Sequence, residues 1–215
     1  MIITCGNEKG GVGKSTIAIN LAVEFAKNDK KVLLVDADIQ KSTTMFAAVR
    51  RESGNLKEII NIEKTGGGLD KDVKALECGF DVVLIDTGGR DSVEMRKAIL
   101  ISDIFVIPTI PSQLDAWSFE KVYSLYLEAQ AFNDKLKAYV VLNKITANWR
   151  SKEKDEMLGF LKDFPEIKTM GSYLKDRASY RKSISEGMGV SEQKTDDKAE
   201  AEIKVLFDEI NNIDI

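Results

Sequence analysis

A glycine-rich stretch near the N-terminus has residue types that are suited to holding phosphate. Residues 8–16 read Glu-Lys-Gly-Gly-Val-Gly-Lys-Ser-Thr, between a short apolar run, 1–5, and a helical pattern, 17–26. A glycine-rich loop between a strand and a helix lets successive backbone N–H groups surround phosphate oxygens. In such a loop Lys14 reaches the terminal phosphates and Ser15 binds Mg²⁺. The predicted phosphate site comprises Gly10, Gly11, Val12, Gly13, Lys14, Ser15 and Thr16.

The spacing within this loop departs from the common phosphate-loop motif. The pattern Gly-x4-Gly-Lys-Ser/Thr requires glycine six residues before Lys14, and this chain has Glu8 there. A second lysine, Lys9, stands immediately before the glycines instead. The alternative is a glycine-rich turn with incidental lysines, which the strand, loop and helix context disfavours.

Three aspartates follow two apolar runs that are typical of buried parallel strands. The run 31–35 is followed by Asp36 and Asp38, and the apolar residues 82–85 are followed by Asp86 and two glycines. The carboxyl ends of parallel strands meet at one sheet edge, where ligands bind in open α/β sheets. Asp86 is therefore predicted to hold Mg²⁺, directly or through water. Taken alone, the other two aspartates fit a helix cap and a turn equally well.

Composition excludes several other kinds of chemistry. The chain of 215 residues has no histidine, which rules out a histidine base or a histidine-ligated metal. The two cysteines, Cys5 and Cys78, form no Cys-x-x-Cys pair and are predicted to be buried thiols in a reducing compartment. No apolar run approaches the roughly 20 residues of a membrane span, and no signal-peptide pattern is present. We expect a cytoplasmic protein.

The order of apolar runs predicts an α/β fold. Strands alternating with helices indicate a doubly wound, mostly parallel sheet with helices on both faces, and residues 1–215 fit a single domain. The stretch 54–70 is the least readable, with a short element and a flexible loop at Gly66-Gly67-Gly68. Further strands are predicted at 103–108 and 136–143, and helices at 41–51, 115–133 and 198–210.

Two motifs carry a resemblance to a known family. Lys9-Gly-Gly-x-Gly-Lys-Ser-Thr resembles the deviant Walker A motif of the ParA/MinD ATPases, and the strand before Asp86 resembles their Walker B strand. The run Asp36-Ala-Asp38-Ile39-Gln40 resembles the Asp-x-Asp-Pro-Gln signature of the ParA proteins, with Ile39 where proline is usual. The resemblance implies a P-loop NTPase fold and hydrolysis of ATP with Mg²⁺.

The resemblance also implies roles for individual residues. Lys9 would reach the nucleotide of a partner subunit, Asp38 would orient the attacking water, and Asp36 would support the Mg²⁺ shell. The run that starts at Asn143 lacks the aspartate of the guanine-binding Asn-Lys-x-Asp motif, and by resemblance Asn143 contacts adenine. The expected catalytic residues are Lys9, Lys14 and Asp38, and the expected metal-binding residues are Ser15, Asp36 and Asp86.

Charge is distributed unevenly over the C-terminal third. Residues 144–182 hold ten Lys/Arg against six Asp/Glu, and residues 183–215 hold nine Asp/Glu against three Lys. A local basic patch suffices for nonspecific DNA binding, but charge alone favours a solvated helix face. Only the resemblance to the ParA family, whose dimers bind DNA without sequence preference, raises DNA binding above that alternative. The acidic C-terminal segment disfavours binding to an anionic membrane. The DNA-binding candidates are Lys175, Arg177, Arg181 and Lys182, and the wider basic set adds Lys144, Arg150, Lys152, Lys154 and Lys168.

Together these features predict an ATP-dependent DNA partition ATPase of the short ParA class, without a helix-turn-helix segment before the P-loop. The resemblance implies an ATP-bound homodimer, nonspecific binding to nucleoid DNA, and a ParB-like centromere-binding partner that stimulates hydrolysis. Three alternatives remain: a MinD-like regulator at a membrane or protein surface, a redox enzyme like the nitrogenase iron protein, and a nonhydrolysing nucleotide-binding scaffold. The redox alternative lacks cysteines in a matching context.

Overall fold

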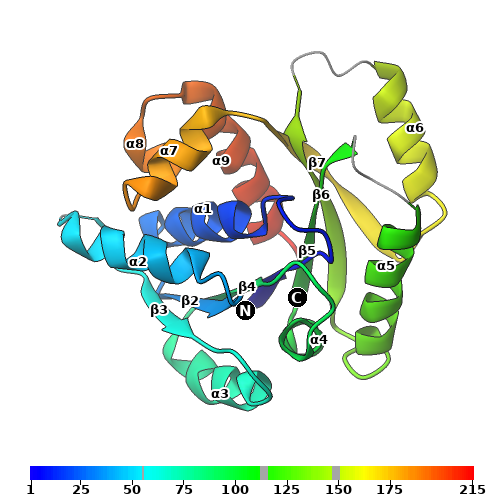
Figure 1. Ribbon diagram of the computed structural model, residues 1–215, viewed down its shortest axis with the longest axis horizontal. Helices are drawn as coiled ribbons and strands as arrows, with labels where there is room; N and C mark the ends of the chain where they lie inside the picture. Colours follow the sequence, from blue (N-terminus) through cyan, green and yellow to red (C-terminus); the bar gives the residue numbers. More distant parts are fainter. Residues whose placement is uncertain (55, 112–115, 147–150) are drawn as a thin grey trace.

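Seven strands form one sheet in this computed structural model, which describes residues 1–54, 56–111, 116–146 and 151–215 (Figure 1). The strand order is β3-β2-β4-β1-β5-β6-β7, and every paired neighbour is parallel. The predicted mostly parallel sheet is thus entirely parallel. The strands are β1 Ile2–Cys5, β2 Val32–Ala37, β3 Ile60–Glu63, β4 Val82–Thr87, β5 Ile104–Thr109, β6 Lys137–Ile145 and β7 Ile167–Lys175.

Helices cover both faces of the sheet, as the alternation of patterns predicts (Figure 1). On one face lie α1 Lys14–Lys27, α2 Ser42–Glu52, α7 Ala178–Ser185, α8 Val190–Gln193 and α9 Asp197–Asn211. On the other lie α3 Leu69–Leu76, α4 Val93–Ile101, α5 Ala116–Gln130 and α6 Ser151–Leu161, and a short 3-10 helix, Glu77–Gly79, follows α3.

The central strands are apolar throughout because both of their faces are buried. In β2, Leu34 packs into the core beneath α1, while Leu33 and Val35 pack into the core beneath α3 and α4. Side chains alternate between faces along a strand, so a strand covered on both sides reads as a continuous apolar run. This is why the sequence predicts these strands well.

Two features differ from the sequence prediction. The stretch 54–70 contributes the edge strand β3 and the start of α3, and β3 gives no clear pattern because its side chains are half-buried or exposed. Cys5 is buried as expected, but Cys78 is exposed, because the short 3-10 helix that contains it lies at the surface.

Element boundaries otherwise agree with the predicted ranges to within a few residues. The helix expected at 115–133 ends at Gln130, and its expected first residue, Asp115, lies outside the described residues. Within the described part of the chain, no helix combines the length and apolarity needed to span a membrane.

Candidate nucleotide-binding site

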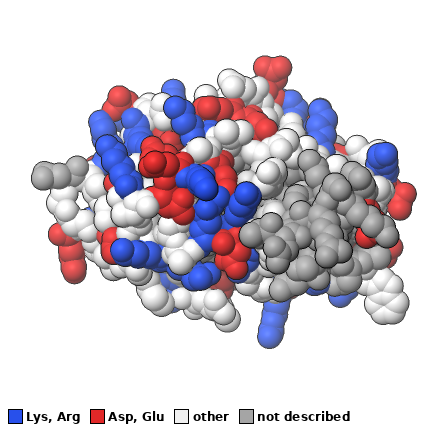
Figure 2. Space-filling model, turned by 90° about the horizontal axis from the view of Figure 1, so that it is seen from above, with Lys and Arg blue, Asp and Glu red and all other residues white. Residues whose placement is uncertain are grey.

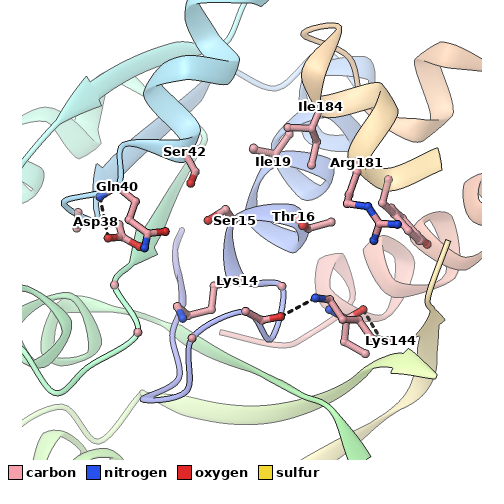
Figure 3. A pocket seen from close by; sticks show the side chains of 18 of the residues that line it. Lys14, Ser15, Thr16, Ile19, Asp38, Gln40, Ser42, Lys144, Arg181 and Ile184 are labelled. Atoms are coloured by element: carbon pink, nitrogen blue, oxygen red, sulfur yellow. Dashed lines mark hydrogen bonds between the residues drawn. The ribbon is translucent and has the colours of Figure 1, made fainter. Parts of the chain in front are cut away.

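The strand register brings the phosphate loop and the aspartates to one sheet edge. Cys5, the last residue of β1, pairs with Asp86 on β4, and Asp86 pairs with Asp36 on β2. The loop after β1 therefore leaves the sheet beside both carboxylates. A cavity of about 950 Å³ opens at this edge, lined by residues that include Lys14, Ser15, Asp38, Gly89, Asn143 and Arg181 (Figure 3).

The loop itself has the backbone conformation of a phosphate cradle. Gly11 and Gly13 have φ of 74° and 98°, the left-handed region that glycine adopts without steric cost. Gly13 then caps α1, so the loop ends at the positive N-terminal end of a helix. The Lys14 ammonium donates to the Lys9 carbonyl oxygen at 3.0 Å, which keeps this side chain folded over the loop.

Lys14 is buried beside acidic groups. Burial lowers the pKa of its ammonium, and the carboxylates of Asp86 and Asp38 oppose this shift. An ammonium held in a poorly hydrated pocket gains from an anion that replaces its lost water. This environment suits Lys14 to bind phosphate.

The end of β6 holds the outer side of the loop. The Asn143 carboxamide donates to the Val12 carbonyl oxygen at 2.7 Å, and the Lys144 ammonium donates to that of Gly11 at 2.6 Å. A Cβ at Gly13 would lie 2.1 Å from the Asn143 side chain, so only glycine fits there. With these carbonyls held outward, the loop amides are free to face a ligand.

The segment after β4 closes over the loop. A Cβ at Gly89 would lie 2.9 Å from the Gly10 Cα, and one at Gly88 would lie 3.5 Å from an Asp38 carboxylate oxygen. Only a residue without a side chain permits the approach at Gly89. The segment after β4 therefore lies directly against the phosphate loop.

The two aspartates of β2 have different surroundings. Asp36 accepts backbone hydrogen bonds from Asp38 at 3.2 Å and from Thr44 at 2.8 Å, so it fixes the turn that leads into α2. Asp38 lines the cavity, and one of its oxygens accepts from the Gln40 amide at 3.0 Å. The predicted roles in metal binding and water positioning stay predictions.

Asp86 is the carboxylate that fits a metal ion. Both of its oxygens are buried, and neither has a hydrogen-bond partner within the described residues. Burial raises the pKa of this carboxyl to about 7, and the Ser15 hydroxyl opposes the shift. A buried carboxylate without partners is costly unless a cation compensates it. Oxygen donors from Asp86 and Ser15 are the kind that Mg²⁺ prefers.

Of the predicted DNA-binding residues, Lys175, Arg177 and Arg181 line the same cavity, but they are not equivalent. Arg181 and Lys182 on α7 are exposed, and Lys175 is half-buried. The Arg177 guanidinium donates to Glu202 on α9 at 2.7 Å and is only 18% exposed, so it is less available to a ligand than its charge suggests. In the wider basic set, the Lys144 ammonium is already bound to the phosphate loop. Arg150 and the side chains of Lys152 and Lys154 lie outside the described residues.

Several residues that shape the site escaped the sequence analysis. The Asn7 carboxamide donates to the Pro108 carbonyl oxygen and accepts from the Lys9 amide, which ties the start of the loop to β5. Lys144 was treated only as a surface charge, although its place after Asn143 at a strand end was a usable signal. Its left-handed backbone, with φ of 53°, marks it as constrained.

Comparison with known proteins assigns the chain to a family. The model of the CobQ/CobB/MinD/ParA nucleotide binding domain matches residues 3–190. The chain belongs to this family. The resemblance to the ParA/MinD ATPases is thereby confirmed, as are the predicted P-loop NTPase fold and the binding of nucleotide.

Relatives and structural neighbours of the chain carry different names. The chain is 28% identical over 153 residues to a ParA protein of Rhizobium radiobacter, covering 71% of this chain and 68% of that one. It is 27% identical over 194 residues to the maintenance of carboxysome distribution protein A of Halothiobacillus neapolitanus, covering 87% and 85%. The fold also matches MinD from Pyrococcus horikoshii, solved with Mg-ADP, with a TM-score of 0.74 and 17% identity over 98% of this chain and 96% of that one.

Proposed function

We propose that this protein is a partition ATPase, which binds Mg-ATP, dimerises around it and binds DNA nonspecifically in that state. The observation that carries the proposal is the position of the basic residues. Lys175 and Arg181 line the same cavity as the phosphate loop, so nucleotide occupancy and the exposed cations of α7 are close enough to influence each other. A chromosome-partitioning ATPase among the relatives, Soj of Thermus thermophilus, supports DNA as the cargo.

Some residues of the site bind the nucleotide, and others orient the groups that react during hydrolysis. The loop amides and Lys14 bind phosphate oxygens, and Ser15 and Asp86 hold Mg²⁺, which supplies positive charge for the phosphates when bound. Asp38 lies at the cavity wall, where it orients a water molecule, and Lys9 from a second copy adds a cation across the interface. Catalysis then rests on positioning and electrostatics, which need no histidine.

A ParB-like, centromere-binding partner completes the proposed cycle. Stimulated hydrolysis removes the phosphate that the Gly88-Gly89 segment contacts, and the dimer separates and leaves DNA. The protein would accordingly be found on the nucleoid in the cytoplasm.

A second candidate is spatial positioning of a protein cargo, as a MinD-like or carboxysome-distribution protein. The match to a carboxysome distribution protein over most of both chains favours it. This function would use the same ATP-dependent dimer and would differ in what the dimer carries.

Co-sedimentation separates the surfaces that these functions need. The purified chain is mixed with plasmid DNA or with anionic liposomes, in the presence of ATP or ADP with Mg²⁺. We expect it to pellet with DNA in ATP and much less in ADP. Pelleting with liposomes alone would favour the MinD-like function, and pelleting with neither would contradict a DNA or membrane surface.

A further inference from the structure

A carboxylate on α9 organises the loop between β7 and α7. Glu202 accepts from the Lys175 amide at 3.1 Å, from the Arg177 guanidinium at 2.7 Å and from the Tyr180 hydroxyl at 3.2 Å. Its side chain is only 15% exposed. Three donors from one loop and the following helix therefore converge on one buried carboxylate.

This loop forms one side of the nucleotide cavity. The cavity lining includes Lys175, Asp176, Arg177 and Tyr180 as well as the phosphate loop. In Figure 3, Asp38 and Gln40 lie on one side of Lys14 and Ser15, while Lys144 and Arg181 lie on the other. The acidic side suits a metal ion and the reacting phosphate, so the nucleoside leaves the phosphate loop on the basic side.

We propose that Glu202 is a positioning residue for nucleotide binding, because it holds the wall against which the nucleoside lies. The inference rests on the proposed nucleotide-dependent function. It assigns to Glu202, a residue outside the phosphate loop, an effect on the affinity for nucleotide. Within the described part of the chain, Glu202 accepts hydrogen bonds from Lys175, Arg177 and Tyr180 and not from the phosphate loop, so it acts through residues 175–180.

The chemistry of the contact explains why one side chain has this effect. A carboxylate that accepts from a guanidinium and a backbone amide makes charge-assisted hydrogen bonds, which fix geometry better than neutral ones. Without it, the one ion-pair partner left to the Arg177 guanidinium among the described residues is Asp196, whose nearest oxygen is 3.8 Å away. The wall then has to be ordered when the ligand binds, which lowers affinity.

The structure offers a matched control on the same helix. Glu209 is also on α9 and also binds β7, where it accepts from the Ser172 amide at 3.2 Å and from the Ser172 hydroxyl at 2.9 Å. Ser172 is not among the residues that line the cavity. Glu209→Gln therefore perturbs the packing of α9 on β7 while leaving the nucleoside wall in place.

The test is calorimetric titration of the full chain with Mg-ADP and with inorganic tripolyphosphate, which has no nucleoside. We expect Glu202→Gln to weaken ADP binding about tenfold and to leave tripolyphosphate binding unchanged. Glu209→Gln should bind both ligands as the wild type does. Tyr180→Phe removes one hydrogen-bond donor to Glu202 and adds no charge, so it should weaken ADP binding to a smaller extent. This variant replaces Glu202→Gln as the test if Glu202→Gln does not fold.

Each other outcome overturns the inference. Equal losses for ADP and tripolyphosphate would make Glu202 a general stability residue, and unchanged ADP binding in Glu202→Gln and Tyr180→Phe would remove its role altogether. The same result in Glu209→Gln as in Glu202→Gln would assign the effect to helix packing. A wild-type chain that binds neither ligand would remove the nucleotide-dependent function itself, which is a distinct failure.

Discussion

At the scale of single residues, the two lysines of the loop have separable tasks. Lys9 is tied into the site by its backbone, since its carbonyl accepts from Lys14 and its amide donates to Asn7. Those two bonds survive truncation of the Lys9 side chain. The backbone geometry of the phosphate loop is therefore separable from the role that we propose for the Lys9 side chain in a second subunit.

Lys9→Ala should keep nucleotide affinity within about twofold of the wild type, because the backbone contacts of the loop remain. Hydrolysis should fall by roughly a hundredfold, the loss typical of one electrostatic group in a transition state. Phosphate release and nucleotide titration measure the two effects. Lys14→Ala is the control that should lose both nucleotide affinity and hydrolysis. Unchanged turnover in Lys9→Ala would contradict the cross-subunit role.

Burial of Asp86 in the proposed metal site lowers the stability of the nucleotide-free fold. The two buried Asp86 oxygens accept no hydrogen bond of normal geometry among the described residues. Burial raises the pKa of the carboxyl to about 7, although the nearby Ser15 hydroxyl and Lys14 ammonium oppose this shift, so the charged form is disfavoured in the nucleotide-free protein. Asp86→Asn should stabilise that state by roughly 1 to 3 kcal/mol, because an amide carries no charge. Thermal unfolding without nucleotide measures this gain.

The same variant should lose its response to metal. The melting temperature of the wild type in ATP should rise further when Mg²⁺ replaces EDTA. The melting temperature of Asp86→Asn should show little additional rise. A nucleotide-free variant less stable than the wild type, with an intact Mg²⁺ response, would remove Asp86 from the metal site.

At the scale of elements, one buried ion pair joins two helices that flank the site. Arg50, near the end of α2, pairs with Glu192 on α8 at 2.7 Å and also donates to the carbonyl oxygens of Lys57 and Gly187. Both side chains are at most 9% exposed. Because α2 begins just after Asp38, this pair fixes the far end of the helix that leads out of the site.

Arg50→Lys should destabilise the fold by about 3 kcal/mol, since lysine cannot reproduce the guanidinium fork and leaves Glu192 poorly paired in the interior. Urea unfolding followed by circular dichroism measures the change. Lys74→Ala breaks an exposed ion pair with Glu77 and should match the wild type. Equal stability of the Arg50 and Lys74 variants would show that the buried pair adds little.

The elements that the sequence predicts best are those in which burial or ligand binding requires a particular residue type at each position. β1, β2, β4 and the phosphate loop follow from apolar runs and glycine spacing, since burial on both faces and phosphate binding each impose a residue type. β3 is short and half-exposed, so it leaves no such pattern. The apolar strand that ends at Asp86, taken together with the phosphate loop, predicts a metal-binding carboxylate there, and the structure buries both of its oxygens; its role in metal binding stays a prediction.

Residues that act through tertiary contacts could not be found in this way. Arg177 was predicted from charge to meet DNA, but charge does not reveal that Glu202, 25 residues later, pairs with it. Asn143 was assigned to adenine, and its side chain also contacts the phosphate loop across 131 residues. Both contacts depend on which helix or strand packs beside the site, and sequence spacing alone does not specify that.

At the scale of the whole molecule, charges of both signs are interspersed on the described part of one face. Figure 2 shows Lys and Arg side chains next to Asp and Glu on the described part of one face. The net charge of the chain is −4. DNA binding by such a surface has to come from a local group of cations rather than from the overall field.

Arg181→Glu combined with Lys182→Glu should therefore weaken DNA binding in ATP and lower the slope of log affinity against log salt by about two. Binding measured across a salt series tests this. Lys71→Glu combined with Lys74→Glu on α3 makes the same change in net charge on the opposite face of the sheet, and it should have a smaller effect. Equal losses in both double variants would contradict a DNA surface on α7.

The carboxylates of α9 also bear on how copies of the chain can associate. β7 is an edge strand, and the amides of Ser172 and Lys175 are occupied by Glu209 and Glu202. An edge strand whose amides are taken offers little template to another strand. The C-terminal half of β7 is thus protected against cross-β aggregation and sheet extension, so any association of copies through the sheet would have to use the other edge strand, β3.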